Sequence, residues 1–190
     1  ASEHPDIVAA AEERFRTMRT RTPHFRLFPR SNTVRANLAE RPPKPPAPDI
    51  RLDTLEPRKA VSGYPPLGPP RVNRSIRGNP LRVNGSTYEH GIGVHAPSEL
   101  VYPIPESAVR FVALAGADDE MKGKRPTMVF KVYVDGREAA ASPVVQLGEP
   151  WHFNVSLHAD ANTLRLVVEP AEDGIGADHG NWLSAGFLRD

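Results

Sequence analysis

The sequence predicts an all-β protein whose main part is an antiparallel β-sandwich, preceded by a short N-terminal helix and a proline-rich linker. After Asp49, apolar residues recur at every second position in short runs that are rich in β-branched and aromatic residues. Gly, Pro, Asp and Asn separate these runs, and helical periodicity is weak throughout this part of the chain. Six or more short strands with little helix are typical of two packed antiparallel sheets.

The N-terminal quarter is expected to differ from the rest of the chain. Residues 6–20 predict a helix, because Asp6 can cap its N-terminus and apolar residues follow at helical spacing. Residues 41–48 read RPPKPPAP, in which five of eight residues are proline, and predict an extended polyproline-type linker. We therefore divide the chain into a helical arm with its linker at 1–48 and the sandwich at 49–190.

Six segments of the sandwich carry the strand pattern. The clearest begins at Trp151, where Phe153, Val155 and Leu157 alternate with polar residues, so that one face of the sheet is buried and the other is wet. The dipeptide at 135–136, Asp-Gly, lies between two strand-like runs and predicts a type I′ hairpin. The predicted strands are residues 98–104, 109–115, 127–134, 151–157, 163–169 and 182–188.

Composition limits the possible function classes. A chain of 190 residues with 39% hydrophobic residues can bury one good core. The net charge of +1 gives no overall field that favours nucleic acid, although residues 1–48 carry nine Lys and Arg against five Asp and Glu. The absence of cysteine excludes disulfides, thiolate nucleophiles and iron–sulfur clusters. No apolar run approaches the roughly 18 residues of a membrane-spanning helix.

The segment YEHGIGVHAPSELVY, residues 88–102, combines glycines with titratable side chains. His90 and His95 could bind a metal or act in acid–base catalysis, but the glycines argue against a helix that pairs them, and no third ligand or nucleophile motif is adjacent. We instead expect Gly91 and Gly93 to let a loop turn tightly into the next strand. In that arrangement His95 is a buried, hydrogen-bonded anchor, and His90 is the histidine that can meet a ligand.

Two acidic segments are candidates for calcium. Residues 116–120, GADDE, place three carboxylates in a row after an apolar strand, and adjacent acids repel one another unless they are exposed or bound to a cation. Residues 172–182 hold further acids among glycines without the spacing of an EF-hand, so a site would be assembled from separate loops. We expect Asp119, Glu120 and Asp173 to bind a structural Ca²⁺; the alternative is a pair of solvated turns.

Four segments resemble the NPCBM domain, which is related to family 51 carbohydrate-binding modules. They occur in the family's order and read RGNPLRVNGSTYEHGIGVHAPSELVY (77–102), FVALAGADDE (111–120), VFKVYVDG (129–136) and ADHGNWLSAGF (177–187). The resemblance covers the chain from about Asp49 onward. It implies a galactose-binding-like jelly roll that is non-catalytic, often holds a structural calcium and binds galactose-containing glycans through loops at one end of the sandwich.

The resemblance also assigns positions. His95 falls in the family's Gly-x-His loop, residues 118–120 in its acidic turn, and Asp178, His179 and Trp182 in its C-terminal motif. The family motif reads Asp-His-Ala-Asp-Trp, whereas residues 180–181 are Gly-Asn here, so that one carboxylate is lost.

We therefore expect a non-catalytic carbohydrate-binding module on a secreted, periplasmic or cell-surface protein, since the chain starts without methionine as a processed or partial chain would. Stacking on an aromatic ring and a few hydrogen bonds would hold a galactose-type glycan. An open pocket between loops 88–95, 116–125 and 172–182 would favour this function, and a filled, dry surface there would favour the alternative. The alternative is an assembly module whose arm, residues 1–48, docks on a host enzyme or larger complex. The expected ligand-binding residues are Tyr88, His90, Asp118, Asp178, His179 and Trp182.

Overall fold

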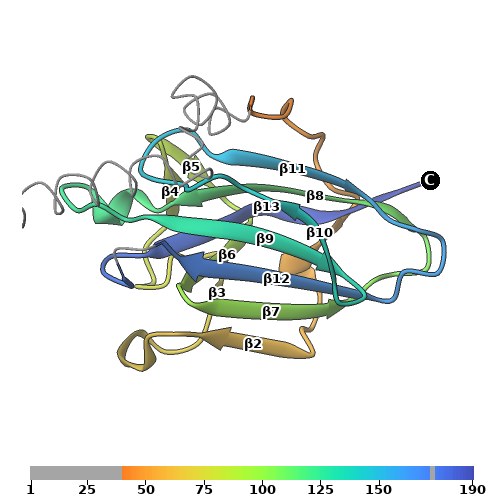
Figure 1. The fold of residues 1–190 in the computed structure, drawn as a ribbon, viewed down its shortest axis with the longest axis horizontal. Coiled ribbons are helices and arrows are strands. Elements are labelled where there is room, and N and C mark those ends of the chain that lie inside the picture. The colour runs from red at the N-terminus through yellow and green to blue at the C-terminus, as the bar shows by residue number, and fades with distance from the viewer. Residues whose placement is uncertain (1–39, 172–173) are drawn as a thin grey trace, which may run out of the picture. The chain divides into compact units, whose positions relative to one another are not determined.

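The computed structural model describes residues 40–171 and 174–190, which fold as an antiparallel β-structure (Figure 1). The helix expected at residues 6–20 lies outside the described residues. Within the described part, short 3-10 helices occur at η1 (Leu52–Thr54), η2 (Pro65–Leu67) and η3 (Asp119–Met121). The strands are β1 (Ile50–Arg51), β2 (Lys59–Ser62), β3 (Arg71–Val72), β4 (Leu81–Val83), β5 (Ser86–Tyr88), β6 (Gly91–His95), β7 (Ser98–Pro103), β8 (Ala108–Ala117), β9 (Met128–Val134), β10 (Arg137–Ala141), β11 (Trp151–Ser156), β12 (Thr163–Pro170) and β13 (His179–Arg189).

The strands form two main sheets that pack face to face (Figure 1). One sheet has the order β11-β8-β13-β6-β3, with β1 added beside β13, and the other has the order β10-β9-β12-β7-β2. All strand pairs are antiparallel. The predicted all-β antiparallel sandwich is confirmed, and each of the six predicted strands is present with ends that differ by a few residues.

Alternating side chains build the core between the sheets. In β9 every second residue is buried, from Met128 to Val134, and β12 follows the same pattern. Across the sandwich, the ring of Phe130 meets the ring of Trp182 edge-on at a centroid distance of 5.0 Å. The predicted type I′ hairpin joins β9 to β10, because Asp135 and Gly136 both adopt the positive φ that this turn requires, 47° and 81°.

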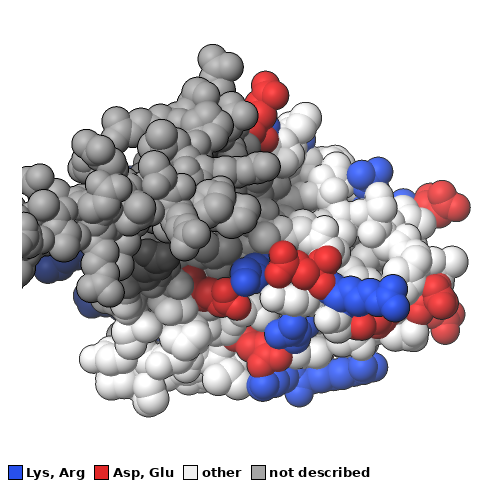
Figure 2. Space-filling view, viewed as in Figure 1, with Lys and Arg blue, Asp and Glu red and all other residues white. Residues whose placement is uncertain are grey.

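Opposite charges cover the outer face of the five-stranded sheet, where Figure 2 shows acidic and basic side chains side by side. Lys131 Nζ lies 2.7 Å from Glu169 Oε2 on the neighbouring strand. The Arg165 guanidinium sits 3.8 Å from the centre of the Tyr133 ring, also across the strand pair. Because charged cross-strand pairs are favourable on a surface that faces water, we interpret this face of the sheet as exposed to solvent.

A second, smaller core lies on the other side of the six-stranded sheet. The β4–β5 hairpin covers Leu114 of β8 and Leu183 of β13 with its own buried residues Leu81 and Val83, and Tyr88 packs at the margin. This hairpin therefore fixes the β8 end of the sheet and the η3 segment that follows it.

Gly91 and Gly93 lie in a strand and not in the predicted loop, so the expected reason for these glycines is wrong. Strand β6 is fully buried and pairs with β13 on one side and β3 on the other. A Cβ on Gly91 would lie 2.6 Å from the carbonyl oxygen of Trp182, and one on Gly93 would lie 2.4 Å from that of Arg74. Glycine is needed here because two backbone segments approach closely, and not because the chain turns.

The end of the proline-rich segment contacts the sandwich. His152 of β11 donates its Nδ1–H to the carbonyl oxygen of Pro42 over 2.7 Å, and Arg41 donates to the carbonyl oxygen of Glu149. The compact unit that contains the sheets accordingly begins at Glu40, nine residues before the predicted start of the sandwich. Within the described residues, no helix has the length and apolar character that crossing a membrane requires.

Candidate functional site

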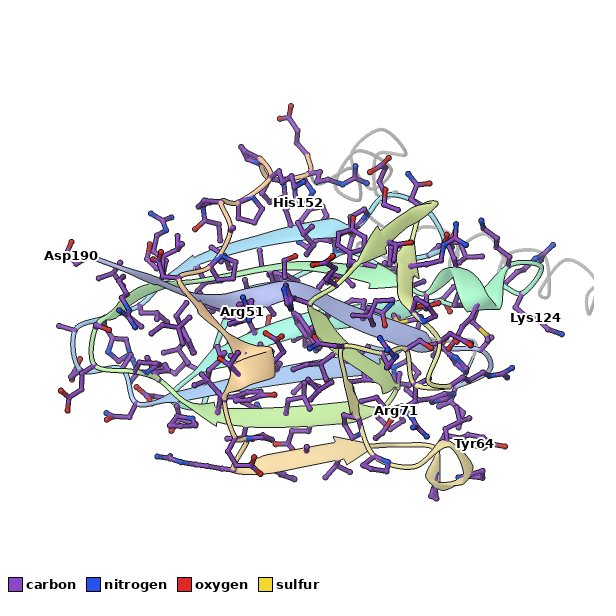
Figure 3. The ribbon with its side chains drawn as sticks, turned by 180° about the vertical axis from the view of Figure 1, so that it is seen from behind. Arg51, Tyr64, Arg71, Lys124, His152 and Asp190 are labelled. Atoms are coloured by element: carbon purple, nitrogen blue, oxygen red, sulfur yellow. The ribbon has the colours of Figure 1, made fainter. Side chains whose placement is uncertain are left out.

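A cleft of about 610 Å³ opens at one end of the sandwich, where β6 ends and β13 begins. Figure 3 places Tyr64 and Lys124, which both line the cleft, at the same end of the molecule and opposite to Asp190. Short loops that are distant in sequence form its walls. The main lining residues are Tyr64, Leu67, Arg77, His95, Glu120, Met121, Lys124, Arg125, Ile175 and His179.

Two neighbouring histidines form the floor of the cleft. Strand pairing places His95 directly opposite His179, and their rings meet edge-on with centroids 5.2 Å apart. The ring of Tyr64 stacks on that of His95 at 5.2 Å, while Tyr64 itself stays 41% exposed. The sandwich therefore supplies the two imidazoles, and the η2 loop supplies an aromatic wall beside them.

Glu120 holds His179 in place. The Nδ1–H of His179 donates to Glu120 Oε1 over 2.5 Å, while Ser75 Oγ and Asn79 Nδ2 donate to Glu120 Oε2 over 2.6 and 2.8 Å. Burial disfavours the charged form of Glu120, but the hydrogen bonds from these three side chains outweigh burial and hold its pKa below the usual value. The carboxylate is thus ionised and fully engaged at neutral pH.

His95 presents a hydrogen-bond acceptor to the cleft. Its Nδ1 lies 2.6 Å from the carbonyl oxygen of Ala96, and a carbonyl can only accept, so Nδ1 carries the proton. Burial lowers the pKa of His95, the bond to Ala96 opposes this, and the electrostatic effect of the neighbouring His179 and Arg77 lowers it further. A neutral ring protonated at Nδ1 leaves the lone pair of Nε2 available.

Both Nε2 atoms face accessible space. Neither Nε2 atom has a hydrogen-bond partner among the described residues. The buried polar atoms without a partner in this part of the chain do not include them, so both Nε2 atoms are accessible. The floor of the cleft therefore offers two polar atoms, on His95 and His179, that a bound molecule can satisfy.

The rim of the cleft is basic. Arg77, Lys122, Lys124 and Arg125 are exposed and line it. Lys122 Nζ lies 3.5 Å from Asp119 Oδ2, and the other three cations form no ion pair with any described residue. The rim thus carries more positive charge than the protein around it neutralises.

The prediction that Trp182 stacks on a sugar is wrong. Its side chain is fully buried between Phe130 and Phe153, with ring centroids 5.0 and 5.5 Å away, because its strand directs it into the space between the sheets. The two residues that depart from the family motif precede Trp182 in β13 and point to opposite faces of the sheet. Gly180 leaves room for Phe130, whose ring would lie 3.0 Å from a Cβ there, and the buried Asn181 donates to Asp118 Oδ2 over 2.6 Å.

Asp118 and Asp178 do not contact the cleft and cannot contact a ligand there, because each is only 1% exposed. Asp118 accepts hydrogen bonds from the backbone N–H of Glu120 and of Arg82, at 2.8 and 3.3 Å. Burial raises its pKa although these bonds oppose the shift. Asp178 Oδ1 accepts from the backbone N–H of Thr127 over 3.0 Å. Both expected ligand contacts are therefore structural carboxylates that tie loops together.

His90 and Tyr88 also lie away from the cleft, so the two histidines of the 88–102 segment exchange their expected roles. His90 precedes β6 while His95 ends it, so the strand separates them by its full length. His90 Nδ1 lies 2.9 Å from Asp53 Oδ2, and Tyr88 packs on the small second core. His95 is buried and hydrogen-bonded as predicted, yet it is the one that faces the cleft.

The two described carboxylates that were expected to bind calcium, Asp119 and Glu120, accept hydrogen bonds from different parts of the protein. The Asp119 oxygens accept from the backbone N–H groups of Asn84 and Gly85, at 3.1 and 2.8 Å, and so brace the β4–β5 turn. Glu120 is engaged by the side chains described above, and Asp173 lies outside the described residues. Among the described residues, no group of three His, Asp or Glu is placed to hold a metal ion. The calcium site stays a prediction from the resemblance.

Sequence reasoning missed the loop residues of the cleft. The cleft does involve loops 88–95, 116–125 and 172–182, the place where an open pocket would favour sugar binding, since His95, Glu120 and His179 come from these segments. Tyr64 comes from a segment without a recognised pattern, and Arg77 begins the segment 77–102 that resembles the family but was not expected to contact a ligand. Lys124 and Arg125 belong to KGKRP, a basic run directly after the acidic turn, and this reversal of charge was a signal for a charged rim.

A β-sandwich whose end loops surround a polar cleft with an aromatic wall defines a ligand-binding module. This chain belongs to the NPCBM/NEW2 domain family, which matches residues 48–188. That membership confirms the family prediction and places the chain among carbohydrate-binding modules, which are not catalytic domains.

Solved structures of similar sequence support the same class. The CBM51 domain of GH95 from Clostridium perfringens, solved with methyl-galactose, is 33% identical with a TM-score of 0.66; the match covers 72% of this chain and 97% of that one. The chain with CBM51-2 and INT domains of ZmpB from Clostridium perfringens, solved with GlcNAc, is 31% identical with a TM-score of 0.68; the match covers 74% of this chain and 31% of that one.

A curated relative is far longer than this chain. A predicted endo-alpha-N-acetylgalactosaminidase of Renibacterium salmoninarum is 31% identical over 156 residues, which are 77% of this chain and 10% of the relative. The chain thus spans about a tenth of that protein.

Proposed function

We propose that the cleft binds the terminal sugar of a galactose-type or N-acetylhexosamine-containing glycan. The observation that carries this proposal is the floor of the cleft, where the Nε2 atoms of His95 and His179 have no hydrogen-bond partner among the described residues and lie beside the exposed ring of Tyr64. A pyranose presents hydroxyl groups along its edges and an apolar C–H face, and both can be satisfied in a small preformed site of this kind.

The hydrogen-bond roles follow from the tautomers. Nε2 of His95 accepts a hydrogen bond from a sugar hydroxyl, because Nδ1 carries its proton and donates it to the carbonyl of Ala96. His179 is oriented by Glu120, so its Nε2 is fixed in position before the sugar arrives. Leu67 and Ile175 supply apolar wall on either side of these polar atoms.

The ligands of the similar solved domains agree with this chemistry. One holds methyl-galactose and the other GlcNAc, both single neutral sugars. A cleft that orders one or two sugar residues makes few contacts, so we expect a dissociation constant of about 10 μM to 1 mM.

Titration of the whole chain tests the proposal. Isothermal calorimetry with methyl galactosides, N-acetylhexosamines and short galactosyl oligosaccharides is expected to give saturable binding. The absence of saturable binding to every one of them would overturn the sugar site.

A pair of tyrosine variants locates the site. Tyr64→Ala is expected to weaken the affinity at least about tenfold, because it removes the aromatic wall and the support of His95. Tyr133→Ala is the matched control, since Tyr133 lies under Arg165 on the outer face of the five-stranded sheet. An equal loss in both variants would show that the cleft is not the site.

We further propose that the domain is an accessory module of an exported glycan-active protein, which it holds near its substrate. The support is the relation to a much longer predicted endo-alpha-N-acetylgalactosaminidase. Mass spectrometry of cell fractions tests this proposal: peptides of this chain should be found outside the cytoplasm, together with peptides of a larger polypeptide. Recovery from the cytoplasm alone would contradict it.

A further inference from the structure

A second hollow adjoins the cleft. It has a volume of about 400 Å³ and is lined by residues 124–127 with Gln146 and Leu147. Lys124 and Arg125 line both the cleft and this hollow. The two basic residues thus form a ridge, the Lys124–Arg125 ridge, with binding space on each side of it.

The positive charge of this region is not balanced by carboxylates of the described residues. Among the described residues that line the cleft, Glu120 is the one carboxylate, and it is taken up by His179, Ser75 and Asn79. The described lining of the second hollow contains no carboxylate. Neither ridge residue forms an ion pair within the part of the chain that the structure describes.

The ridge does not reflect a generally basic domain. Residues 49–190 carry fifteen Lys and Arg against eighteen Asp and Glu, so this part of the chain is acidic overall. On the outer face of the five-stranded sheet Lys131 is paired with Glu169, whereas the exposed Arg137 and Arg189 form no ion pair with a described residue and line neither hollow. Position therefore distinguishes Arg77 and the two ridge residues, because all three line the same cleft.

We infer that the glycan recognised by this cleft carries an anionic group, a sulfate ester or a carboxylate, which the Lys124–Arg125 ridge binds. The terminal sugar lies in the cleft, and the chain continues over the ridge into the second hollow. Guanidinium groups bind such oxyanions with paired hydrogen bonds, and ammonium groups bind them as point charges. This inference rests on the proposed sugar site and specifies which class of glycan fills it.

The test compares matched saccharides by calorimetry with the whole chain. Galactosyl disaccharides are used in a neutral, a sulfated and a uronic- or sialic-acid-containing form. At least one anionic form is expected to bind about tenfold more tightly than its neutral counterpart, and which form does so distinguishes sulfate from carboxylate. Raising NaCl from 50 to 500 mM should reduce this preference, because exposed charges are screened, and should leave neutral binding unchanged.

Two double variants assign the preference to the ridge. Lys124→Ala/Arg125→Ala is expected to remove the roughly tenfold preference while neutral binding changes less than about twofold. Arg137→Ala/Arg189→Ala removes the same charge from two exposed sites outside the lining of both hollows, and should keep the preference. Thermal melts confirm that both variants fold.

The outcomes separate this inference from the proposed function. Binding of neutral and anionic forms with equal affinity would overturn the inference and leave the sugar site standing. An anionic preference that survives in the ridge variant, or that disappears equally in the control, would also overturn it. If no saccharide binds at all, both the sugar site and the inference fail.

Discussion

Two histidine–carboxylate pairs occupy opposite ends of strand β6, and only one of them faces a cleft. At one end His179 donates to Glu120 over 2.5 Å beside His95, and at the other His90 lies 2.9 Å from Asp53. The first pair is buried, with side chains 4% and 9% exposed, whereas the His90 side chain is 39% exposed.

The surroundings of the two pairs explain the difference. Asp53 also accepts from Asn73 and Arg51, at 3.0 and 3.1 Å, and these bonds together hold its pKa below the usual value although burial opposes them. Asn73 in turn accepts from the backbone N–H of Gly91, so this network ties loops to the start of β6. A histidine–carboxylate pair is therefore not a binding site by itself, because accessible space beside the ring decides its role.

The largest expected effect comes from removing the cleft pair. His179→Ala should lower the free energy of unfolding by about 2–3 kcal/mol, because Glu120 would stay buried without its main partner. Sugar binding should be lost, since one of the two floor atoms is gone. Chemical denaturation and calorimetry measure both.

A double variant sharpens this prediction. His179→Ala/Glu120→Gln should recover about 1 kcal/mol or more relative to His179→Ala, because no buried charge is left without its partner. Sugar binding should stay lost. If the second substitution lowers stability further, the buried charge of Glu120 is not the source of the loss.

The next effect in size is that of His95. His95→Ala should weaken sugar affinity about tenfold and cost about 1–2 kcal/mol of stability, because Nε2, the bond to Ala96 and the stack under Tyr64 are all removed. His152→Ala is a matched control, since His152 donates the same kind of bond to the carbonyl of Pro42 but lies outside the cleft. Equal sugar affinities of the two variants would refute the role of His95.

The far pair should respond weakly. His90→Ala is expected to cost about 0.5–1 kcal/mol, because Asp53 keeps its bonds to Asn73 and Arg51 and the lost partner is partly exposed. Sugar affinity should stay within about twofold of the unmodified chain. A tenfold loss of affinity in His90→Ala would place a ligand contact at the wrong end of β6.

The regular part of the fold could be predicted from the sequence because strand alternation is a local signal. In residues 128–134 and 163–170 apolar side chains recur at every second position, which indicates one buried and one exposed face. Asp135-Gly136 indicates the turn between β9 and β10. Strand β6 was missed because the buried segment GIGVH contains two glycines and reads as a loop.

The site was harder to predict because it is not local in sequence. The pairing of His95 with His179 joins segments that lie 84 positions apart, and the register between β6 and β13 is what brings the rings together. Trp182 is of a residue type that often stacks on sugars, but a shift of one position along the strand decides whether a side chain points into the core or to the other face of the sheet. The basic rim was not predicted because its residues lie in loops. Arg77 lies between β3 and β4, two strands that the sequence pattern did not indicate, and Lys124 and Arg125 lie in a loop between two predicted strands whose path the pattern does not define.

The smallest expected effect is a pH dependence of stability and sugar affinity that arises from His95, at the cleft end of β6. Burial holds the pKa of His95 below its usual value of 6.5, so the folded state binds fewer protons than the unfolded state just below that value. Stability should therefore fall as pH drops from about 6.5 toward the lowered pKa, and the fall should be absent in His95→Ala. Sugar affinity should stay constant down to this window and then decrease, because protonation turns the acceptor Nε2 into a donor. Calorimetric titrations and denaturation curves between pH 8 and 5 measure both quantities. An equally large pH-dependent change of sugar affinity in His95→Ala would assign the titration to another group.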